Sequence, residues 1–433
     1  MSVHQKGRTK VMRRISSKLF VVTLAFLLLA CTTTGLAKVK IVFSDEFEYG
    51  PQGFKVFEEL VKEFEKQNPD IEVEFQPFTG GDWQQRIIAQ CSAGKAPDVF
   101  VAYGDFGRVL IENEQLLPLE DHFTDEDLAD FYDGQMNAFW VKGHLYEIPK
   151  YVSTIALAYN KDIFDAAGVP YPGEDWNWDD FLAAAKKVTE QDPKTRQYTW
   201  GFHAVHNYMW YWVWQNGGEV MDEDFRGTKS LLGQPESLEA MQFVHDLIWE
   251  HKVAPKPADV AGKSLFDTFL LGNIAMSETH SWQLTDYVAR APFDWDVTYL
   301  PKGRTGQRGS VIFADGYGVY KGTKHPEAAI RFLKFITSPY AEEVMCTSIL
   351  SLQPSRKSVA HIWDTDSITA RAGKNAWVYT KTAEFARLDP YFINDAKVRE
   401  IRNPILEQIY LLNKISVEEG IRQYEEKLPR VYE

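Results

Sequence analysis

Residues 146–181 constrain the fold of this chain more than any other segment. They contain a nearly unbroken apolar run at 152–159, which is typical of a strand buried on both faces of a helix-covered sheet. A turn, a short amphipathic helix, a Trp-rich loop and a longer helix follow this run. The strand is entered through Ile148-Pro149-Lys150, and one interpretation of that entry is a crossing between two lobes. A chain with such a crossing would be able to close around a ligand.

Strands and helices alternate regularly in the N-terminal part of the chain. We expect strands at residues 38–44, 71–77 and 98–103, with helices at 55–68 and 82–93 between them. This order predicts a largely parallel sheet with helices on both faces. Because ligands of such sheets bind beyond the carboxyl ends of the strands, residues 45–49, 78–83 and 103–106 are expected on one rim.

The rest of the chain carries a second set of elements, so we expect more than one domain. The apolar patterns predict helices at residues 178–191, 237–252, 265–272 and 325–336, and strands at 274–277, 297–301 and 316–320. At 433 residues the chain is also longer than a single hydrophobic core usually supports. The fold class indicated is α/β with two domains.

The charge and cysteine content argue against several classes of function. A formal net charge of −14, with no basic stripe after residue 20, argues against a nucleic-acid partner, because binding one requires clustered Lys and Arg. Apart from Cys31, the sequence contains only Cys91 and Cys346, so it has no disulfide framework and no cysteine cluster for a metal. These two could form one bridge in an exported protein, although buried free thiols are favoured. We expect no cofactor and no bound metal.

The N-terminal residues 1–37 have the pattern of a secretory signal. Several Lys and Arg side chains precede the apolar block 19–30, which is too short to span a membrane comfortably. Two cleavage sites are open alternatives: Cys31 ends a lipoprotein-type motif and would carry a lipid, whereas Ala37 ends an ordinary signal-peptidase site. Both place the mature protein outside the cytoplasmic membrane, in the periplasm or on the outer face of that membrane. Only the first alternative gives it a membrane contact, through a lipid at Cys31.

A series of short motifs runs through the mature chain in a fixed order. They read PDVF at 97–100, LPLED at 117–121, YEIPKYVSTIALAYNKDIF at 146–164, WNWDDF at 176–181, QNGGEV at 215–220, GNIAMSETHSW at 272–282, YLPKG at 299–303 and HPEAAIRFLKFITSP at 325–339. In this order the chain resembles the family 1 extracellular solute-binding proteins of bacterial ABC importers, the maltodextrin-binding type. Each motif alone is weak, but their succession over nearly the whole mature chain argues against chance.

The resemblance implies a type II periplasmic-binding-protein fold, in which two α/β lobes, each a mostly parallel sheet flanked by helices, are joined by a hinge. It places the hinge crossings near residues 148–152 and 311–315. Lobe one is then expected at 38–149 plus about 315–345, and lobe two at 150–312 plus about 346–433. The implied function is to capture a mono- or oligosaccharide between the lobes and to deliver it to the membrane subunits of an ABC permease. The protein is expected to be a monomer.

The chemistry of sugars indicates which residues would form such a cleft. Sugars present apolar C–H faces and a rim of hydroxyl groups, so their sites combine flat aromatic rings with paired polar side chains. Strand ends, hinge crossings and the resemblance together indicate these candidate ligand-binding residues: Asp45, Glu46, Trp83, Tyr103, Tyr151, Ser153, Asn207, Trp210, Trp282 and Asp315. Trp282 aligns with the stacking Trp of the family. For Trp83, Asn207 and Trp210, packing within a lobe is the alternative.

Two residues bear on the identity of the ligand. Ser153 aligns with a position that is acidic in maltodextrin binders, which indicates a different ligand for this chain. Lys150 is expected to be a solvent-exposed hinge residue; alternatively, it could meet an anionic sugar such as a uronate through a charge-assisted hydrogen bond. The surplus of aromatic residues favours an oligosaccharide over a monosaccharide.

A glycoside hydrolase is the rival class, because aromatic and acidic clefts also hydrolyse sugars. No paired carboxylates stand out on adjacent strand ends, and the sequence contains no G-x-S-x-G, H-E-x-x-H, phosphate-loop or dinucleotide-binding motif. We therefore expect a binding protein with no catalytic residues. A second rival is a binding protein for another solute, such as a glycerophosphodiester, a polyamine or an oligopeptide.

Overall fold

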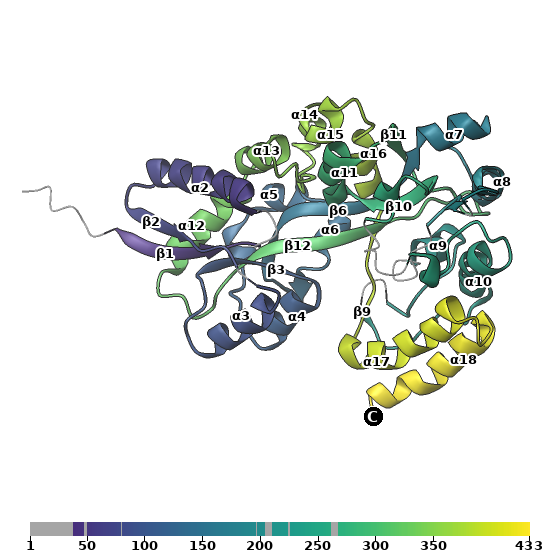
Figure 1. Cartoon of the computed structure of the whole chain (residues 1–433). Coiled ribbons are helices and arrows are strands. Elements are labelled where there is room, and N and C mark those ends of the chain that lie inside the picture. The colour runs from purple at the N-terminus through teal and green to yellow at the C-terminus, as the bar shows by residue number, and fades with distance from the viewer. Residues whose placement is uncertain are drawn as a thin grey trace, which may run out of the picture.

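The computed structural model describes residues 38–46, 50–78, 80–195, 197–203, 210–223, 226–260 and 267–433. Figure 1 shows two groups of helices, one around strands β1, β2 and β3 and the other around strand β10, joined by the long strands β6 and β12. The described chain thus has two halves that share strands rather than two separate sheets.

One eight-stranded sheet runs through both halves. Its strands follow the order β10-β6-β12-β3-β1-β2, with β11 also paired to β6 and β13 to β12. The strands are β1 (Val39–Ser44), β2 (Ile71–Phe75), β3 (Val99–Tyr103), β6 (Glu147–Asn160), β10 (Met276–His280), β11 (Trp295–Thr298), β12 (Val311–Val319) and β13 (Arg387–Leu388). Strand β1 is parallel to β2 and β3, as the N-terminal alternation predicts. Strand β12 runs antiparallel to β3 and β6, and β10 and β11 run antiparallel to β6.

The N-terminal part of the sheet carries the first hydrophobic core. Helices α2 (Gly50–Gln67), α3 (Trp83–Ser92) and α4 (Gly104–Glu112) follow β1, β2 and β3 in turn, and α12 (Pro326–Ile336) and α13 (Pro339–Thr347) join them. Helix α2 buries Phe57, Leu60 and Phe64, because this spacing places apolar side chains on one helix face. The Phe43 ring on β1 packs against Phe57 and Phe332, with ring centroids 6.0 and 4.9 Å away. Strand and helices therefore form one packed unit.

The second half contains two further cores, one on each face of the sheet. Helices α8 (Trp178–Val188), α9 (Trp210–Gln215), α10 (Pro235–Trp249), α17 (Asp395–Leu406) and α18 (Val417–Lys427) form the core on one face. Helices α11 (Leu284–Arg290), α14 (Ala360–Asp366) and α16 (Trp377–Ala383) form the core on the other. Ile155 and Leu157 of β6 belong to the first of these cores, and Ala156 and Ala158 to the second. Alternate residues of β6 are thus buried on opposite faces, which explains its apolar run.

Several predicted boundaries differ from the structure for local reasons. Strand β6 begins at Glu147, before the predicted residue 152, and all of its residues are buried. Helix α8 ends at Val188 rather than at 191, because Glu190–Gln191 form a short strand, β7, that pairs with β8 (Tyr198–Thr199). The helix predicted at 265–272 lies partly outside the described residues, and its described part contains a 3-10 turn at Phe269–Leu271. The remaining short α-helices and strands of the described residues are α5 (Asp125–Ala129), α6 (Asp133–Met136), β4 (Trp140–Val141), β5 (His144–Leu145), α7 (Lys161–Ala167), β9 (Arg226–Gly227), α15 (Ile368–Arg371) and β14 (Tyr391–Phe392).

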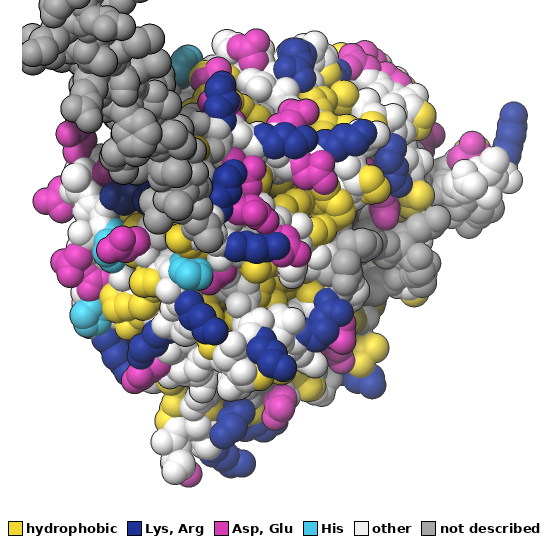
Figure 2. Space-filling model, turned by 90° about the vertical axis from the view of Figure 1, so that its left-hand side faces the viewer, with side chains coloured by type: hydrophobic (Ala, Val, Ile, Leu, Met, Phe, Trp, Pro, Cys, Tyr) yellow, Lys and Arg dark blue, Asp and Glu magenta, His cyan; other side chains and the backbone are white. Residues whose placement is uncertain are grey.

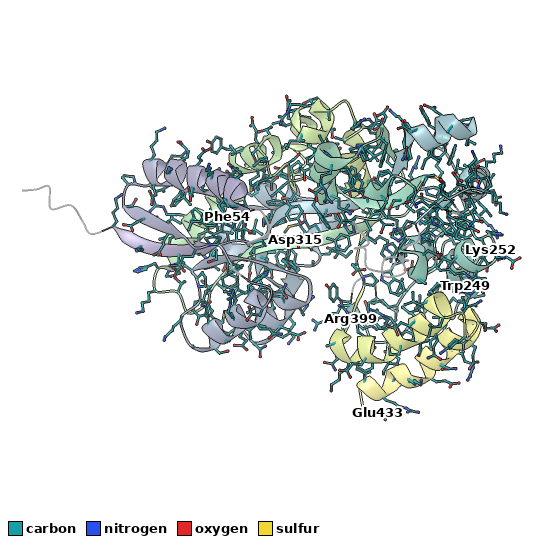
Figure 3. All side chains as sticks on the ribbon, viewed as in Figure 1. Phe54, Trp249, Lys252, Asp315, Arg399 and Glu433 are labelled. Atoms are coloured by element: carbon teal, nitrogen blue, oxygen red, sulfur yellow. The ribbon has the colours of Figure 1, made fainter. Side chains whose placement is uncertain are left out.

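Strands β6 and β12 each pass from one half of the molecule to the other. Tyr151 on β6 and Tyr317 on β12 belong to the first core, whereas Ile155 and Val311 belong to the second. Asp315 lies between these groups, in the middle of the molecule (Figure 3). Strand β6 therefore passes from the first core to the second within residues 151–155, and β12 passes between the same two cores within residues 311–317. Both stretches overlap the crossings expected near 148–152 and 311–315. The lobe limits themselves stay a prediction.

A glycine allows the two strands to pack closely at the crossing. The pairing of β6 with β12 shifts register between Asp315 and Gly316. A Cβ atom at Gly316 would lie 2.9 Å from the Phe139 ring and 3.0 Å from the carbonyl oxygen of Ile148. The Ile148 carbonyl is backbone and cannot rotate away, so a side chain at this position would push the strands apart.

The surface and the cysteines bear on three further expectations. On the face shown in Figure 2, Lys and Arg side chains are interspersed with Asp and Glu. Among the helices of the described residues, none is both long and apolar enough to cross a membrane. Cys91 and Cys346 are buried free thiols, as favoured from the sequence, and the alternative of a bridge between them is wrong. Cys31 and the rest of residues 1–37 lie outside the described residues.

Candidate ligand-binding cleft

A cleft with a volume of about 560 Å³ lies where β3, β6 and β12 meet. Its described lining residues come from both halves of the molecule: Glu46, Tyr103, Tyr151, Trp282, Thr285, Asp286, Asp315, Ile349, Leu350 and Leu352. Glu46 lies just beyond the end of β1 and Tyr103 ends β3, so the carboxyl ends of parallel strands supply one wall, as the topology predicts. The sequence candidates that line this cleft are Glu46, Tyr103, Tyr151, Trp282 and Asp315.

Trp282 presents an aromatic ring in this cleft. It lies in the turn Ser281–Gln283 between β10 and α11, and 39% of its surface is exposed. The backbone N–H of His280 donates to the Gln283 side chain at 2.7 Å, which fixes the turn that carries the indole. The His280 ring lies 5.6 Å from the Trp282 ring, and burial lowers the pKa of His280 to about 3, so this imidazole is neutral. The exposed indole is a flat apolar surface on which a ligand ring can stack.

A buried charge cluster lies behind the opposite wall. The Lys150 ammonium is fully buried and donates to Asp45 at 2.5 Å, and it lies 3.8 Å from the Glu46 carboxylate. The Tyr317 hydroxyl also donates to Asp45. Burial alone would lower the pKa of Lys150, but the carboxylates of Asp45 and Glu46 outweigh this and raise it, so the ammonium stays charged.

Both sequence interpretations of Lys150 are wrong. Its side chain is neither solvent-exposed nor directed at a ligand, because the ammonium lies among the rings of Phe57, Tyr151 and Tyr317 at 5.6 to 6.0 Å. Asp45 is likewise fully buried, so its carboxylate is a partner of Lys150 rather than a cleft residue. Sequence reasoning placed both residues correctly at strand positions near the cleft. It could not show that the Lys150 ammonium would be buried in an ion pair with the Asp45 carboxylate.

Asp315 and Tyr151 form a polar pair on the cleft wall. They are opposite each other in the β6–β12 pairing, and their side chains share a hydrogen bond. Burial raises the pKa of Asp315 to about 6, and the charge of Asp45 adds to this rise, whereas Tyr151 and Lys150 act in the opposite direction. A carboxyl group of this kind can accept hydrogen bonds from ligand hydroxyls at neutral pH.

The remaining candidates do not line the cleft. Trp83 is buried in the first core, stacked on Phe78 with ring centroids 4.4 Å apart. Trp210 is buried in the second core, with the Arg402 guanidinium 5.4 Å from its ring. Ser153 is also buried. For Trp83 and Trp210 the alternative of lobe packing therefore holds, because the helices that carry them face their own cores. Asn207 lies outside the described residues.

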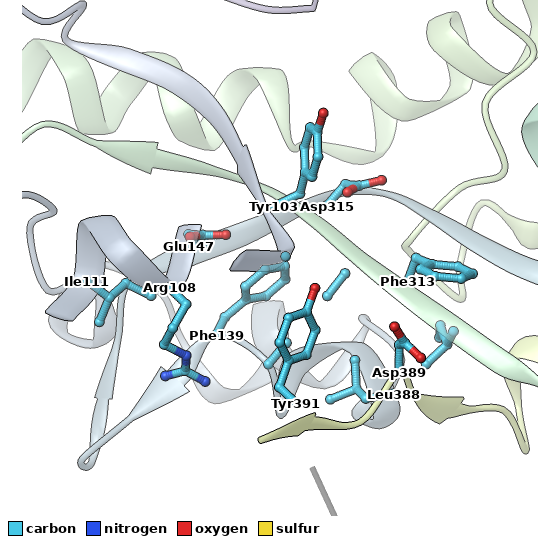
Figure 4. A pocket seen from close by; sticks show the side chains of 14 residues that line it. Tyr103, Arg108, Ile111, Phe139, Glu147, Phe313, Asp315, Leu388, Asp389 and Tyr391 are labelled. Carbon is cyan, nitrogen blue, oxygen red and sulfur yellow. The ribbon is translucent and has the colours of Figure 1, made fainter. Parts of the chain in front are cut away.

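A smaller pocket of about 120 Å³ adjoins the cleft, and sequence reasoning missed its Arg108, Glu147 and Asp389. It shares Tyr103 and Asp315 with the cleft and adds Arg108, Glu147, Asp389 and Tyr391, which come from both halves (Figure 4). Burial raises the pKa of Glu147 to about 8, with the Arg108 charge opposing and the Asp315 charge adding to the rise. The one available signal was an acidic residue opening an otherwise apolar strand.

Glycines make room for this pocket. A Cβ atom on Gly107 would lie 2.6 Å from the Glu147 carboxylate, and one on Gly104 would lie 2.7 Å from the Tyr391 hydroxyl. Gly104 also has a φ of 51°, in the left-handed region that favours glycine. Near this pocket the Arg226 guanidinium of β9 pairs with Glu112 of α4, so an ion pair links the two halves.

The arrangement is suited to binding a polar ligand with apolar faces. The cleft combines one exposed indole, two tyrosine side chains and several carboxylates, which are the groups that recognise sugar rings and hydroxyls. Within the described residues, no group of three or more His, Cys, Asp or Glu side chains is placed to hold a metal ion.

Comparison with known proteins gives the family. Residues 50–343 match the family model described as bacterial extracellular solute-binding protein. The arabinooligosaccharide-binding protein of Halalkalibacterium halodurans is 28% identical over 330 residues, covering 73% of this chain and 71% of that protein. An ABC substrate-binding protein from Listeria monocytogenes, solved in complex with cycloalternan, is 30% identical with a TM-score of 0.76, over 91% of this chain and 99% of that one.

A third likeness concerns the fold alone. The cyclic alpha-maltosyl-1,6-maltose binding protein from Arthrobacter globiformis is 18% identical and superimposes with a TM-score of 0.77, over 91% of this chain and 99% of that one. These likenesses confirm the two-lobed α/β fold that the sequence motifs indicated. Because the family model matches more than half of the sequence, the chain belongs to the bacterial extracellular solute-binding proteins.

Proposed function

We propose that this protein is the extracytoplasmic carbohydrate-binding component of an ABC importer and that it captures an oligosaccharide in the cleft between its halves. The observation that carries the proposal is the exposed Trp282 ring in a cleft that also contains Tyr103, Tyr151 and carboxylates from both halves. Aromatic stacking and carboxylate–hydroxyl hydrogen bonds together recognise saccharides. The name of the Halalkalibacterium protein, which refers to arabinooligosaccharides, and the cycloalternan bound in the Listeria structure support the same class.

The size of the cleft suits a small-molecule ligand. Small-molecule sites commonly enclose about 300–1,000 Å³, and the volume here is about 560 Å³. The adjoining pocket behind Tyr103 and Asp315 extends the space available to a ligand.

Capture would proceed by closure of the two lobes about β6 and β12. Glu46 and Tyr103 lie on the first lobe, and Trp282 and Asp286 on the second, so a ligand contacts all of them only when the lobes are close together. The ligand would therefore favour the closed state through its higher affinity for that state. The closed protein would then deliver the sugar to the permease subunits. Export would depend on residues 1–37, with Cys31 as the candidate lipid anchor.

A thermal-shift screen tests this proposal. The purified mature protein is heated in the presence of neutral oligosaccharides, monosaccharides, amino acids and short peptides. A ligand that binds only the native state stabilises it by about 2.7 kcal/mol when present at about 100 times its Kd. We expect the largest rise in melting temperature with an oligosaccharide. Shifts caused only by amino acids or peptides would refute the sugar assignment.

A second measurement separates binding from hydrolysis. The same oligosaccharides are incubated with the protein, and the reducing ends are counted over time. We expect stoichiometric binding without release of reducing ends. Their steady release would favour the glycoside hydrolase alternative, in which the carboxylates of the cleft act on the glycosidic bond.

A further inference from the structure

The charges on the cleft wall point to the class of saccharide that the cleft accepts. The described lining residues include the carboxylates of Glu46, Asp286 and Asp315, and they include no Lys or Arg. These acidic residues come from three separate segments: Glu46 lies just beyond β1, Asp286 on helix α11 and Asp315 on strand β12. Asp286 is partly screened by Arg290 at 3.5 Å, whereas Glu46 and Asp315 are more deeply placed.

The described cations beside the cleft lie next to carboxylates: Arg290 pairs with Asp286, Arg108 lies in the adjoining pocket near Glu147, and Lys150 lies behind the cleft wall. Lys150 is fully buried, and its ammonium is in contact with Asp45 at 2.5 Å and within 3.8 Å of Glu46. One positive charge thus faces the negative charges of Asp45 and Glu46, and Asp315 adds to them. A carboxylate on a bound ligand would meet the negative side of this cluster, because the ammonium cannot reach the cleft without leaving Asp45.

We propose that the cleft selects uncharged saccharides and rejects uronate-bearing ones, with Glu46 and Asp315 as the residues that determine this selectivity. The inference rests on the proposed function and specifies its ligand class. Hydroxyl groups of a neutral sugar can donate to both carboxylates, and such charge-assisted hydrogen bonds are stronger than neutral ones. A ligand carboxylate has no proton to donate and is repelled by both groups in a partly desolvated site.

Lys150 acts here as a positioning residue. Its buried ammonium donates to Asp45 and lies 3.8 Å from the Glu46 carboxylate, so it attracts that carboxylate from behind the wall. The Tyr151 hydroxyl in turn bonds to Asp315. Trp282 supplies the stacking surface for any saccharide, charged or not, so charge selection is assigned to the carboxylates alone.

Matched pairs of probes test this inference. Malto-, cello- and galacto-oligosaccharides are compared with the same chains oxidised at C6 to uronates, by thermal shift and calorimetry at pH 7.5 and low salt. For each neutral chain that binds, we expect the oxidised chain to bind at least about tenfold more weakly, since one repelling charge at this range acts on the order of a kcal/mol or more. The ratio of the two affinities should fall as salt is added.

Variants identify the responsible carboxylates. In Glu46→Gln and Asp315→Asn, the ratio of neutral to oxidised affinity should fall about tenfold toward unity, even where the neutral chain also binds more weakly. Asp133→Asn is the matched control, because this carboxylate is exposed on α6 and does not line the cleft. Melting curves of each variant without ligand show whether it folds, and the salt dependence of the unmodified protein tests the inference independently of any variant.

The outcomes are distinguishable. Equal or tighter binding of an oxidised chain by the unmodified protein would overturn the charge selection and leave the saccharide-binding proposal standing. A ratio that does not change in Glu46→Gln and Asp315→Asn would also overturn it. If no saccharide in the panel bound and only amino acids or peptides did, the proposed function itself would fail.

Discussion

Replacing Trp282 with alanine measures how much the exposed ring contributes to binding. A tryptophan side chain can bury up to about 250 Å², so the exposed 39% corresponds to about 100 Å² by that scale. A sugar ring on one face would cover about half of that area, and at about 25 cal/mol per Å² this contributes about 1.2 kcal/mol. We therefore expect Trp282→Ala to weaken binding roughly 5- to 10-fold.

The assay is calorimetric titration with the oligosaccharide that produces the largest thermal shift, together with urea unfolding of the free protein. Trp140→Ala is the matched control, because Trp140 has nearly the same exposure, 40%, but lies on β4 and does not line the cleft. We expect the control to leave the affinity unchanged. The reasoning would be refuted if Trp282→Ala kept its affinity while losing stability, since the ring would then be a packing element. Equal weakening by both substitutions would refute it as well.

Three further predictions concern stability and reactivity. Glu147 has a pKa raised to about 8, so the folded state keeps this group protonated between its ordinary pKa and about pH 8. Its contribution to the free energy of unfolding is full below about pH 4, falls by up to about 1.4 kcal/mol per pH unit between the two pKa values, and levels off above about pH 8. Between pH 5 and pH 8, the free energy of unfolding measured in urea should fall less for Glu147→Gln than for the unmodified protein. An equal fall in both proteins would contradict this prediction. Lys150→Met should lower the free energy of unfolding by about 3–5 kcal/mol, because it leaves Asp45 buried without its countercharge. Chemical denaturation checks this, and a loss under about 1 kcal/mol would contradict a stabilising role for the buried ion pair. Burial raises the pKa of Cys91 and Cys346 to about 12, so a thiol reagent at pH 8 should modify neither in the native protein and both after unfolding, as intact mass would show.

Much of the architecture could be predicted because it depends on local patterns. The alternation of elements before Tyr103 and the apolar run of β6 each reflect side-chain periodicity, which is set by backbone geometry within a few residues. The strand-end rule placed Glu46 and Tyr103 at the cleft for the same reason, since parallel strands end at a common edge. Such predictions need no knowledge of which distant residues meet.

The errors arose where long-range contacts decide the role of a side chain. Lys150 reads as a solvent-exposed residue beside a proline, yet it is buried because Asp45, far away in sequence, supplies the countercharge. Trp210 and Trp282 were both candidates, but Trp210 lies on a helix that faces its own core and Trp282 lies in a fixed turn that opens on the cleft. Burial depends on which surfaces pack together, and a single sequence does not contain that information locally.

The sequence by itself therefore determined the family, the α/β class, the approximate hinge crossings as expectations and part of the cleft lining. Only the tertiary structure decided which charges face the ligand space and which are neutralised behind its wall, because electrostatic pairing joins residues that are more than one hundred positions apart, as in the contact of Lys150 with Asp45. It also brought Arg108, Glu147 and Tyr391 together around one pocket. The apolar run at residues 152–159 marks where the chain crosses, and the folding of distant segments around that crossing determines what the cleft can hold.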